Sequence, residues 1–189
     1  MKLSKKHILL GIICLTSAIL SNVPVVCAII PYLAFCLCSF ALMNGKKAIG
    51  TVTVLLIGFV GLPLFKFVYS MLTVSFMTTP IANVLVLLVH TGVYFGLFIL
   101  INSWIRKEKF AFSLTMGILT VICIAIYCAV EGLRTFALFS AMNQAMEQGA
   151  LINWLNVIDG GNIFVSIISE LAFFAALWCV SIRFIKKDQ

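Results

Sequence analysis

The chain has 189 residues, of which 63% are hydrophobic and only 10% are charged. A water-soluble domain is about half apolar and carries about 25% charged residues, so this chain cannot cover a soluble surface. The composition excludes a cytosolic enzyme, a disordered tail and a nucleic-acid-binding domain. It predicts a multi-pass membrane protein whose first partner is the lipid bilayer.

The charged residues are distributed unevenly along the chain. A net charge of +7 results from 13 Lys and Arg residues against 6 Asp and Glu residues. All but two of the basic residues fall in four short clusters between apolar runs, namely Lys2, Lys5 and Lys6; Lys46 and Lys47; Arg106, Lys107 and Lys109; and Arg183, Lys186 and Lys187. Basic residues at the ends of apolar segments hold loops in the cytoplasm during insertion. The clusters therefore indicate orientation, and no nucleic-acid partner.

The first apolar run is too long for one membrane crossing, which needs about 20 residues to pass through about 30 Å of hydrocarbon. It contains Asn22 and Pro24, which favour a turn and end helices. We therefore predict a tight helical hairpin with arms at residues 8–21 and 25–43. One tilted helix over residues 8–43 is the alternative, but it would place the first two basic clusters on opposite sides of the membrane.

The N-terminus also resembles a cleavable signal peptide, with a basic start, an apolar stretch and a small-residue site at Val26-Cys27-Ala28. The residues that follow this site are apolar as well, so cleavage would leave no polar mature start. We expect a retained helix.

Four more apolar runs follow, at residues 48–71, 81–105, 110–130 and 163–182. With both termini in the cytoplasm, six spans place all four basic clusters on the cytoplasmic side. The sequence therefore predicts one all-α transmembrane bundle of six spans over residues 1–189. We expect it in the inner membrane of a bacterium.

The only long hydrophilic stretch, residues 131–159, lies between the fifth and sixth spans. Its polar and apolar residues separate onto two helical sides over residues 133–148, and apolar residues repeat at helical spacing over residues 151–158. We predict two short amphipathic helices lying on the outer membrane surface. Extension of the fifth span beyond the bilayer is the alternative.

A few ionisable residues lie inside the predicted spans, where each costs about 3 kcal/mol or more and marks a functional candidate. Glu170 lies seven residues into the last span and His90 nine residues into the fourth, about 10 to 14 Å below the outer surface. Polar stripes at helical spacing on four spans lie in the outer half of the membrane or at its edge. We predict an outward-facing cavity lined by Lys66, His90, Tyr94, Glu131, Arg134 and Glu170.

The alternative is that these groups only satisfy one another. Glu131 and Arg134 are one helical turn apart and suit an ion pair, and Glu170 would then pair with Lys66 or His90. On the fourth span, Gly92 and Gly96 form a GxxxG motif, which we expect to pack within the protein's own bundle.

Both signs of charge together with aromatic groups suit a small zwitterionic or heteroaromatic solute. Six spans in about 190 residues, with cytoplasmic termini and polar residues in the outer half, are similar to the substrate-binding subunits of energy-coupled vitamin-uptake transporters. The resemblance is one of architecture and includes no sequence motif. It implies binding or transport of a solute.

Two other classes of function stay open. A non-catalytic immunity, assembly or regulatory factor would bind a membrane-protein partner. An intramembrane enzyme would use His90 and Glu170 on a lipid-linked substrate, although HExxH and GxSxG motifs are absent. The seven cysteines lie in apolar runs without metal-ligand spacing. We therefore expect no catalytic residues, no metal and no cofactor.

Overall fold

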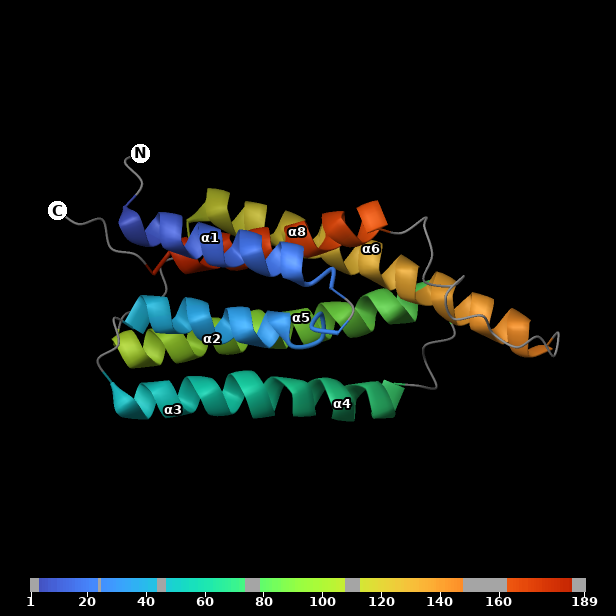
Figure 1. Ribbon diagram of the computed structural model, residues 1–189, viewed down its shortest axis with the longest axis horizontal. Helices are drawn as coiled ribbons and strands as arrows, with labels where there is room; N and C mark the ends of the chain where they lie inside the picture. The colour runs from blue at the N-terminus through green and yellow to red at the C-terminus, as the bar shows by residue number, and fades with distance from the viewer. Residues whose placement is uncertain are drawn as a thin grey trace.

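The computed structural model describes residues 4–23, 25–43, 47–73, 79–107, 113–147 and 163–184. Every regular element in these residues is helical, which confirms the all-α class. The elements are α1 (Lys5–Leu20), α2 (Ile30–Met43), α3 (Ala48–Leu56), η1 (Ile57–Gly61), α4 (Leu62–Thr73), α5 (Pro80–Arg106), α6 (Leu114–Glu147) and α8 (Ile163–Ile182). Because α3, η1 and α4 form one continuous rod, the described part of the chain contains six helical rods (Figure 1).

Four segments within these rods are long and apolar enough to cross a membrane: Ala48–Met71, Ile81–Arg106, Leu114–Ala137 and Phe164–Ile182. Their lengths of 19 to 26 residues correspond to about 28 to 39 Å of helix, close to the thickness of the hydrocarbon core. α1, with 16 residues, and α2, with 14 residues, are shorter. The chain thus has the helices of an integral membrane protein.

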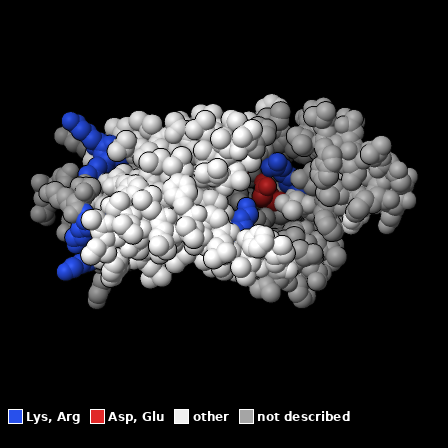
Figure 2. Space-filling view, turned by 60° about the horizontal axis from the view of Figure 1, so that its bottom comes forward, with Lys and Arg blue, Asp and Glu red and all other residues white. Residues whose placement is uncertain are grey.

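The rods run side by side in alternating directions, and the start of α1 and the end of α8 lie at the same end of the bundle (Figure 1). The described residues of the basic clusters are Lys5, Lys6, Lys47, Arg106, Lys107 and Arg183. Figure 2 shows Lys and Arg side chains gathered at one end of the molecule. We call this the basic end. Within the bundle, α8 packs against α6 and α1, and α5 packs against α6 and α2.

The predicted hairpin at the N-terminus is confirmed. α1 ends at Leu20 and α2 runs back beside it, with turns over residues 21–23 and 25–29. A single tilted helix over residues 8–43 is therefore wrong. α2 begins at Ile30 rather than at residue 25, and Pro31 occupies its first turn, where the missing N–H of proline has no cost.

The prediction of a separate surface helix at residues 133–148 is wrong. α6 continues without a break from Leu114 to Glu147, over 34 residues or about 51 Å, so the helix of the fifth apolar run continues through this stretch, as the alternative expected. This segment contains no proline, and Gly132 is tolerated inside the helix. An amphipathic period of 3.6 residues is the same for a surface helix and for a continued one. The second predicted helix, at residues 151–158, lies outside the described residues.

An aromatic core joins α2, α5 and α8. The Phe35 ring contacts Tyr94 and Phe98 edge-on, with ring centroids 5.4 Å and 5.5 Å apart, and Tyr94 also contacts Phe173. Such tilted contacts add to the stabilisation from burial alone. On the other side of α2, Gly58 lets the π-helical turn η1 approach closely, because a Cβ there would collide with the Cys36 sulfur.

Candidate functional site

The candidate site lies toward the end of the bundle opposite the basic end, where the N-terminal hairpin stops. Ser21, directly after α1, lies close to the carboxyl group of Glu170. Glu170 is the eighth residue of α8, about 10 Å from the start of that helix. The hairpin turn therefore reaches only the level of Glu170, and Figure 1 shows it stopping short of the ends of α4, α5 and α6.

Glu131 and Arg134 form an ion pair on α6. The Arg134 Nη1 lies 3.3 Å from Glu131 Oε2 and 3.4 Å from Oε1, which confirms the interpretation that these two groups satisfy each other. Both are also tied to α8, since Arg134 Nη1 donates to Ser166 Oγ at 3.2 Å and Ser169 Oγ donates to Glu131 Oε2 at 3.3 Å. The pair therefore joins the two helices at the edge of the site.

Glu170 is half-buried on α8 and lies within electrostatic range of Glu131, Arg134 and Lys66. In the described part of the chain it forms no ion pair at 4.0 Å or less. Arg134 is already held by Glu131. The expected pairing of Glu170 with Lys66 or His90 is thus not formed, and its carboxylate is the uncommitted acid of the site.

His90 and Lys66 face each other from α5 and α4. The His90 ring stacks on Phe65, with centroids 5.9 Å apart and planes at 9°, and Phe65 in turn stacks on Tyr69 at 5.7 Å and 20°. His90 Nδ1 is buried and has no hydrogen-bond partner among the residues that the structure describes. Lys66 is exposed and lies within electrostatic range of the imidazole. Both side chains keep unused hydrogen-bonding capacity.

Tyr94 is placed apart from this cluster. Only 1% of its surface is exposed, and its hydroxyl donates a hydrogen bond to the Pro31 carbonyl oxygen at 2.8 Å. Its ring belongs to the aromatic core described above. The structure therefore brings five of the six predicted residues to one region and gives the sixth a place in the packing beneath it.

The charged part of this region is visible at the molecular surface. Figure 2 shows acidic and basic side chains together in a hollow of an otherwise uncharged surface, away from the basic end. The acidic side chains that the structure describes are Glu131 and Glu170. Charges of both signs in one hollow are suited to a ligand that itself carries both signs.

Two residues of the site did not stand out in the sequence. Ser21 lies in a turn, and no helical spacing connects it with Glu170. Phe65 is one of 16 phenylalanines, and only the fold shows that it stacks on His90. Ser169, in contrast, lies on the same polar stripe of the last span as Glu170, so helical spacing does indicate it.

A buried polar contact in the other half of the bundle was also missed. Asn102 is fully buried, and its Nδ2 donates to Ser39 Oγ at 3.1 Å and to the Phe98 carbonyl at 2.8 Å. The polar stripes of the sequence all lie in the half of the bundle that contains the candidate site, so they gave no indication of this contact. The one sequence feature that could have indicated this contact is the amide side chain of Asn102 inside an apolar run.

The GxxxG motif of α5 is not used for close helix packing as expected. A Cβ at Gly92 or at Gly96 would meet nothing within 4 Å. The two glycines instead line a cavity of about 290 Å³ between α5, α6 and α8, together with residues such as Phe95 and Gly117. A second cavity, of about 430 Å³, lies at the basic end.

These features define an all-helical protein with four helices that are long and apolar enough to cross a membrane, and with a polar site near one end of its bundle. No family model matches the chain, and comparisons with curated proteins and with solved structures give no match either. In the described residues, no three His, Cys, Asp or Glu side chains are grouped so that they could hold a metal ion.

Proposed function

We propose that this protein binds a small solute in an outward-facing polar site and transports it across the inner membrane of a bacterium. In this proposal all six helical rods span the bilayer and the basic end faces the cytoplasm, as the positive-inside rule requires. The candidate site then lies in the outer half of the membrane.

The observation that supports this function is the meeting of polar groups from four helices at the level where the hairpin stops. Lys66, His90, the Glu131–Arg134 pair and Glu170 come from α4, α5, α6 and α8. Beyond the hairpin turn, α1 and α2 no longer contribute to the bundle. Non-helical backbone at membrane depth is tolerated only where it is buried in protein or lines a water-filled space. A water-filled cavity between the hairpin turn and the outer membrane surface would solvate the backbone of the turn. The same cavity would give the polar groups contact with water.

The free groups of the site indicate the chemistry of the solute. Glu170 offers an unpaired carboxylate, Lys66 an ammonium group, and His90 a ring nitrogen without a partner in the described residues. The ladder of His90, Phe65 and Tyr69 offers flat rings. A solute with one cationic group, one anionic group and a planar ring would use all of them.

Native mass spectrometry of the full chain in mild detergent tests this proposal. The wild-type protein is expected to carry a small ligand, and Glu170→Gln is expected to release it because the uncommitted carboxylate is lost. Glu147→Gln is the matched control, since it removes the same charge from α6, 16 residues beyond Glu131, or about 24 Å along the helix. A wild-type protein without any bound mass, or equal retention in both variants, would overturn the proposal.

The open GxxxG surface favours one second candidate, a regulatory or assembly factor that binds another membrane protein. GxxxG motifs allow transmembrane helices to approach closely, and Gly92 and Gly96 line the open cavity between α5, α6 and α8. Gly96→Leu would fill this cavity. If it removes a copurifying membrane protein while ligand retention is unaffected, this second function gains support over transport.

A further inference from the structure

A second cavity lies at the basic end, far along α5 from the candidate site. It has a volume of about 430 Å³ and is formed by the start of α3 and the end of α5. Its lining consists of seven residues, Lys47, Ala48, Ile49, Gly50, Trp104, Ile105 and Lys107. The volume is within the usual range of small-ligand sites, about 300 to 1,000 Å³.

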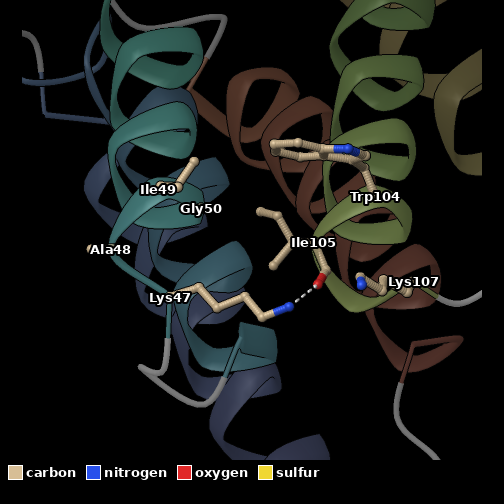
Figure 3. A pocket seen from close by; sticks show the side chains of 7 residues that line it. All are labelled: Lys47, Ala48, Ile49, Gly50, Trp104, Ile105 and Lys107. Carbon is tan, nitrogen blue, oxygen red and sulfur yellow. Dashed lines mark hydrogen bonds between the residues drawn. The ribbon is translucent and has the colours of Figure 1, made fainter.

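The walls of this cavity are apolar and open to the surroundings. Ile49 on α3 is 75% exposed and Trp104 on α5 is 62% exposed, and Figure 3 shows their side chains on the two sides of the cavity with Ile105 between them. Gly50 lets the start of α3 approach the end of α5 closely, because a Cβ there would lie 3.3 Å from Ile105 Cδ1 and 3.1 Å from the Met43 sulfur.

The apolar walls continue along both helices, away from the basic end. On α3 the exposed residues Ile49, Val52 and Leu56 follow one another at helical spacing, and on α5 Leu100 precedes Trp104 by one turn. In a bilayer these surfaces face acyl chains. An occupant of the cavity can therefore extend from a polar mouth into hydrocarbon.

The mouth is positively charged. Lys47 directly precedes α3 and Lys107 directly follows α5, and both line the cavity (Figure 3). Lys47 Nζ donates one long hydrogen bond of 3.4 Å to the Ile105 carbonyl oxygen, which leaves two of its three donors unused. The lining, as the structure describes it, contains no acidic side chain.

We propose that this cavity binds one anionic phospholipid of the cytoplasmic leaflet, with its phosphate between Lys47 and Lys107. One acyl chain lies over Ile49 and Trp104. Lysines at the headgroup level and a tryptophan at the interface match the layers of the bilayer, and basic pockets between helices on the cytoplasmic side are suited to anionic headgroups. The contrast between the charged mouth and the apolar walls favours a lipid over a free anion, which would gain nothing from the walls.

The competing interpretation is that Lys47 only caps the end of α5, where the last carbonyl groups lack partners. It predicts no preference for anionic lipid and no role for Lys107. The two interpretations therefore differ in a measurable way.

The test titrates the full chain in mild detergent with phosphatidylglycerol, phosphatidylcholine or inorganic phosphate and counts bound molecules by native mass spectrometry. We expect one phosphatidylglycerol to bind about 30-fold more tightly than phosphatidylcholine, because each lysine near the headgroup contributes roughly a factor of five. The double variant Lys47→Gln/Lys107→Gln is expected to lose this preference. The matched control Lys5→Gln/Lys6→Gln removes two charges from α1 at the same end, outside the cavity, and is expected to keep it.

Three results would overturn the lipid site: equal affinity for the two lipids in the wild-type protein, an unchanged preference in the double variant, or inorganic phosphate binding as tightly as phosphatidylglycerol. A measurement without lysine variants covers the case in which the double variant does not fold. Lipids with brominated acyl chains quench the fluorescence of nearby tryptophan. The fluorescence of Trp104 is obtained as the difference between the wild-type protein and Trp104→Phe, and we expect the brominated anionic lipid to quench it more than the brominated zwitterionic lipid does. Equal quenching contradicts the proposal.

Discussion

Gly132 of α6 determines how closely this helix approaches α5 beside the candidate site. A Cβ at this position would lie 2.6 Å from Val84 Cγ2, 3.1 Å from Val84 Cα and 3.2 Å from Val84 N. A β-branched side chain in a helix has essentially one rotamer, and two of the three contacts are with backbone atoms. In Gly132→Ala the start of α5 must therefore move away from α6.

The magnitude of this effect follows from two opposing terms. Overpacking a well-filled contact costs about 1 to 3 kcal/mol, whereas alanine in place of glycine inside a helix gains roughly 1 kcal/mol. Since two of its close contacts are with backbone atoms, Gly132→Ala falls in the upper part of this range of cost, about 2 to 3 kcal/mol. We therefore expect a net destabilisation of about 1 to 2 kcal/mol, which lowers the Tm of a chain of this length by about 2 to 8 °C. Gly96→Ala is the matched control, because its Cβ meets nothing within 4 Å and only the favourable term applies.

The assay is thermal unfolding of the purified variants in one detergent, followed by tryptophan fluorescence and by the monodisperse fraction after heating. The expected order of Tm is Gly132→Ala below wild type, and Gly96→Ala equal to or above wild type. If Gly132→Ala unfolds at the wild-type temperature or higher, α5 and α6 are not in contact at Val84, and the arrangement of helices around the site is wrong.

Two further predictions concern the ion pair and the orientation. In a double-mutant cycle of Glu131→Gln and Arg134→Gln, the coupling free energy of unfolding is expected to be about 0.3 to 1 kcal/mol, as for other partly exposed pairs; a coupling of zero would show that the 3.3 Å contact contributes nothing. In the proposed orientation the basic end faces the cytoplasm. Green fluorescent protein fused after Gln189 is then expected to fluoresce, and alkaline phosphatase inserted within residues 148–162 is expected to be active. The reverse pattern of activities would contradict the proposed orientation.

Much of the fold was predictable because turns and charges in a membrane protein have local causes. Asn22 and Pro24 indicated the hairpin, and helix α8 begins and ends where the apolar run does. The π-helical turn at Ile57–Gly61 was not predictable, because its packing against Cys36 is visible only in the fold. The structure of residues 131–147 was ambiguous for a different reason. A hydrophobic period of 3.6 residues occurs both in a helix that lies on the membrane surface and in one that continues a membrane span.

For the site, the sequence could indicate depth but not partners. The spacing of polar residues placed His90 and Glu170 well inside their helices, and the structure brings them to one end of the bundle. It could not show that His90 would stack on Phe65, because that contact joins two helices. Nor could it show that Tyr94 belongs to the core. A buried tyrosine needs a hydrogen-bond partner for its hydroxyl group, and the partner here, the Pro31 carbonyl, lies on another helix.

The unequal lengths of the helices explain why the polar groups lie where they do. α1 and α2, with 16 and 14 residues, are about 24 and 21 Å long, less than the 30 Å or so of hydrocarbon. In the proposed orientation, the basic residues at the start of α1 and directly before α3 hold both ends of this hairpin at the cytoplasmic surface. The whole shortfall in length must then appear on the opposite side, above the turn. An apolar lining there would leave the backbone of the turn without solvation. The short hairpin therefore explains why polar side chains such as Ser21 and Glu170 lie at the level of its turn.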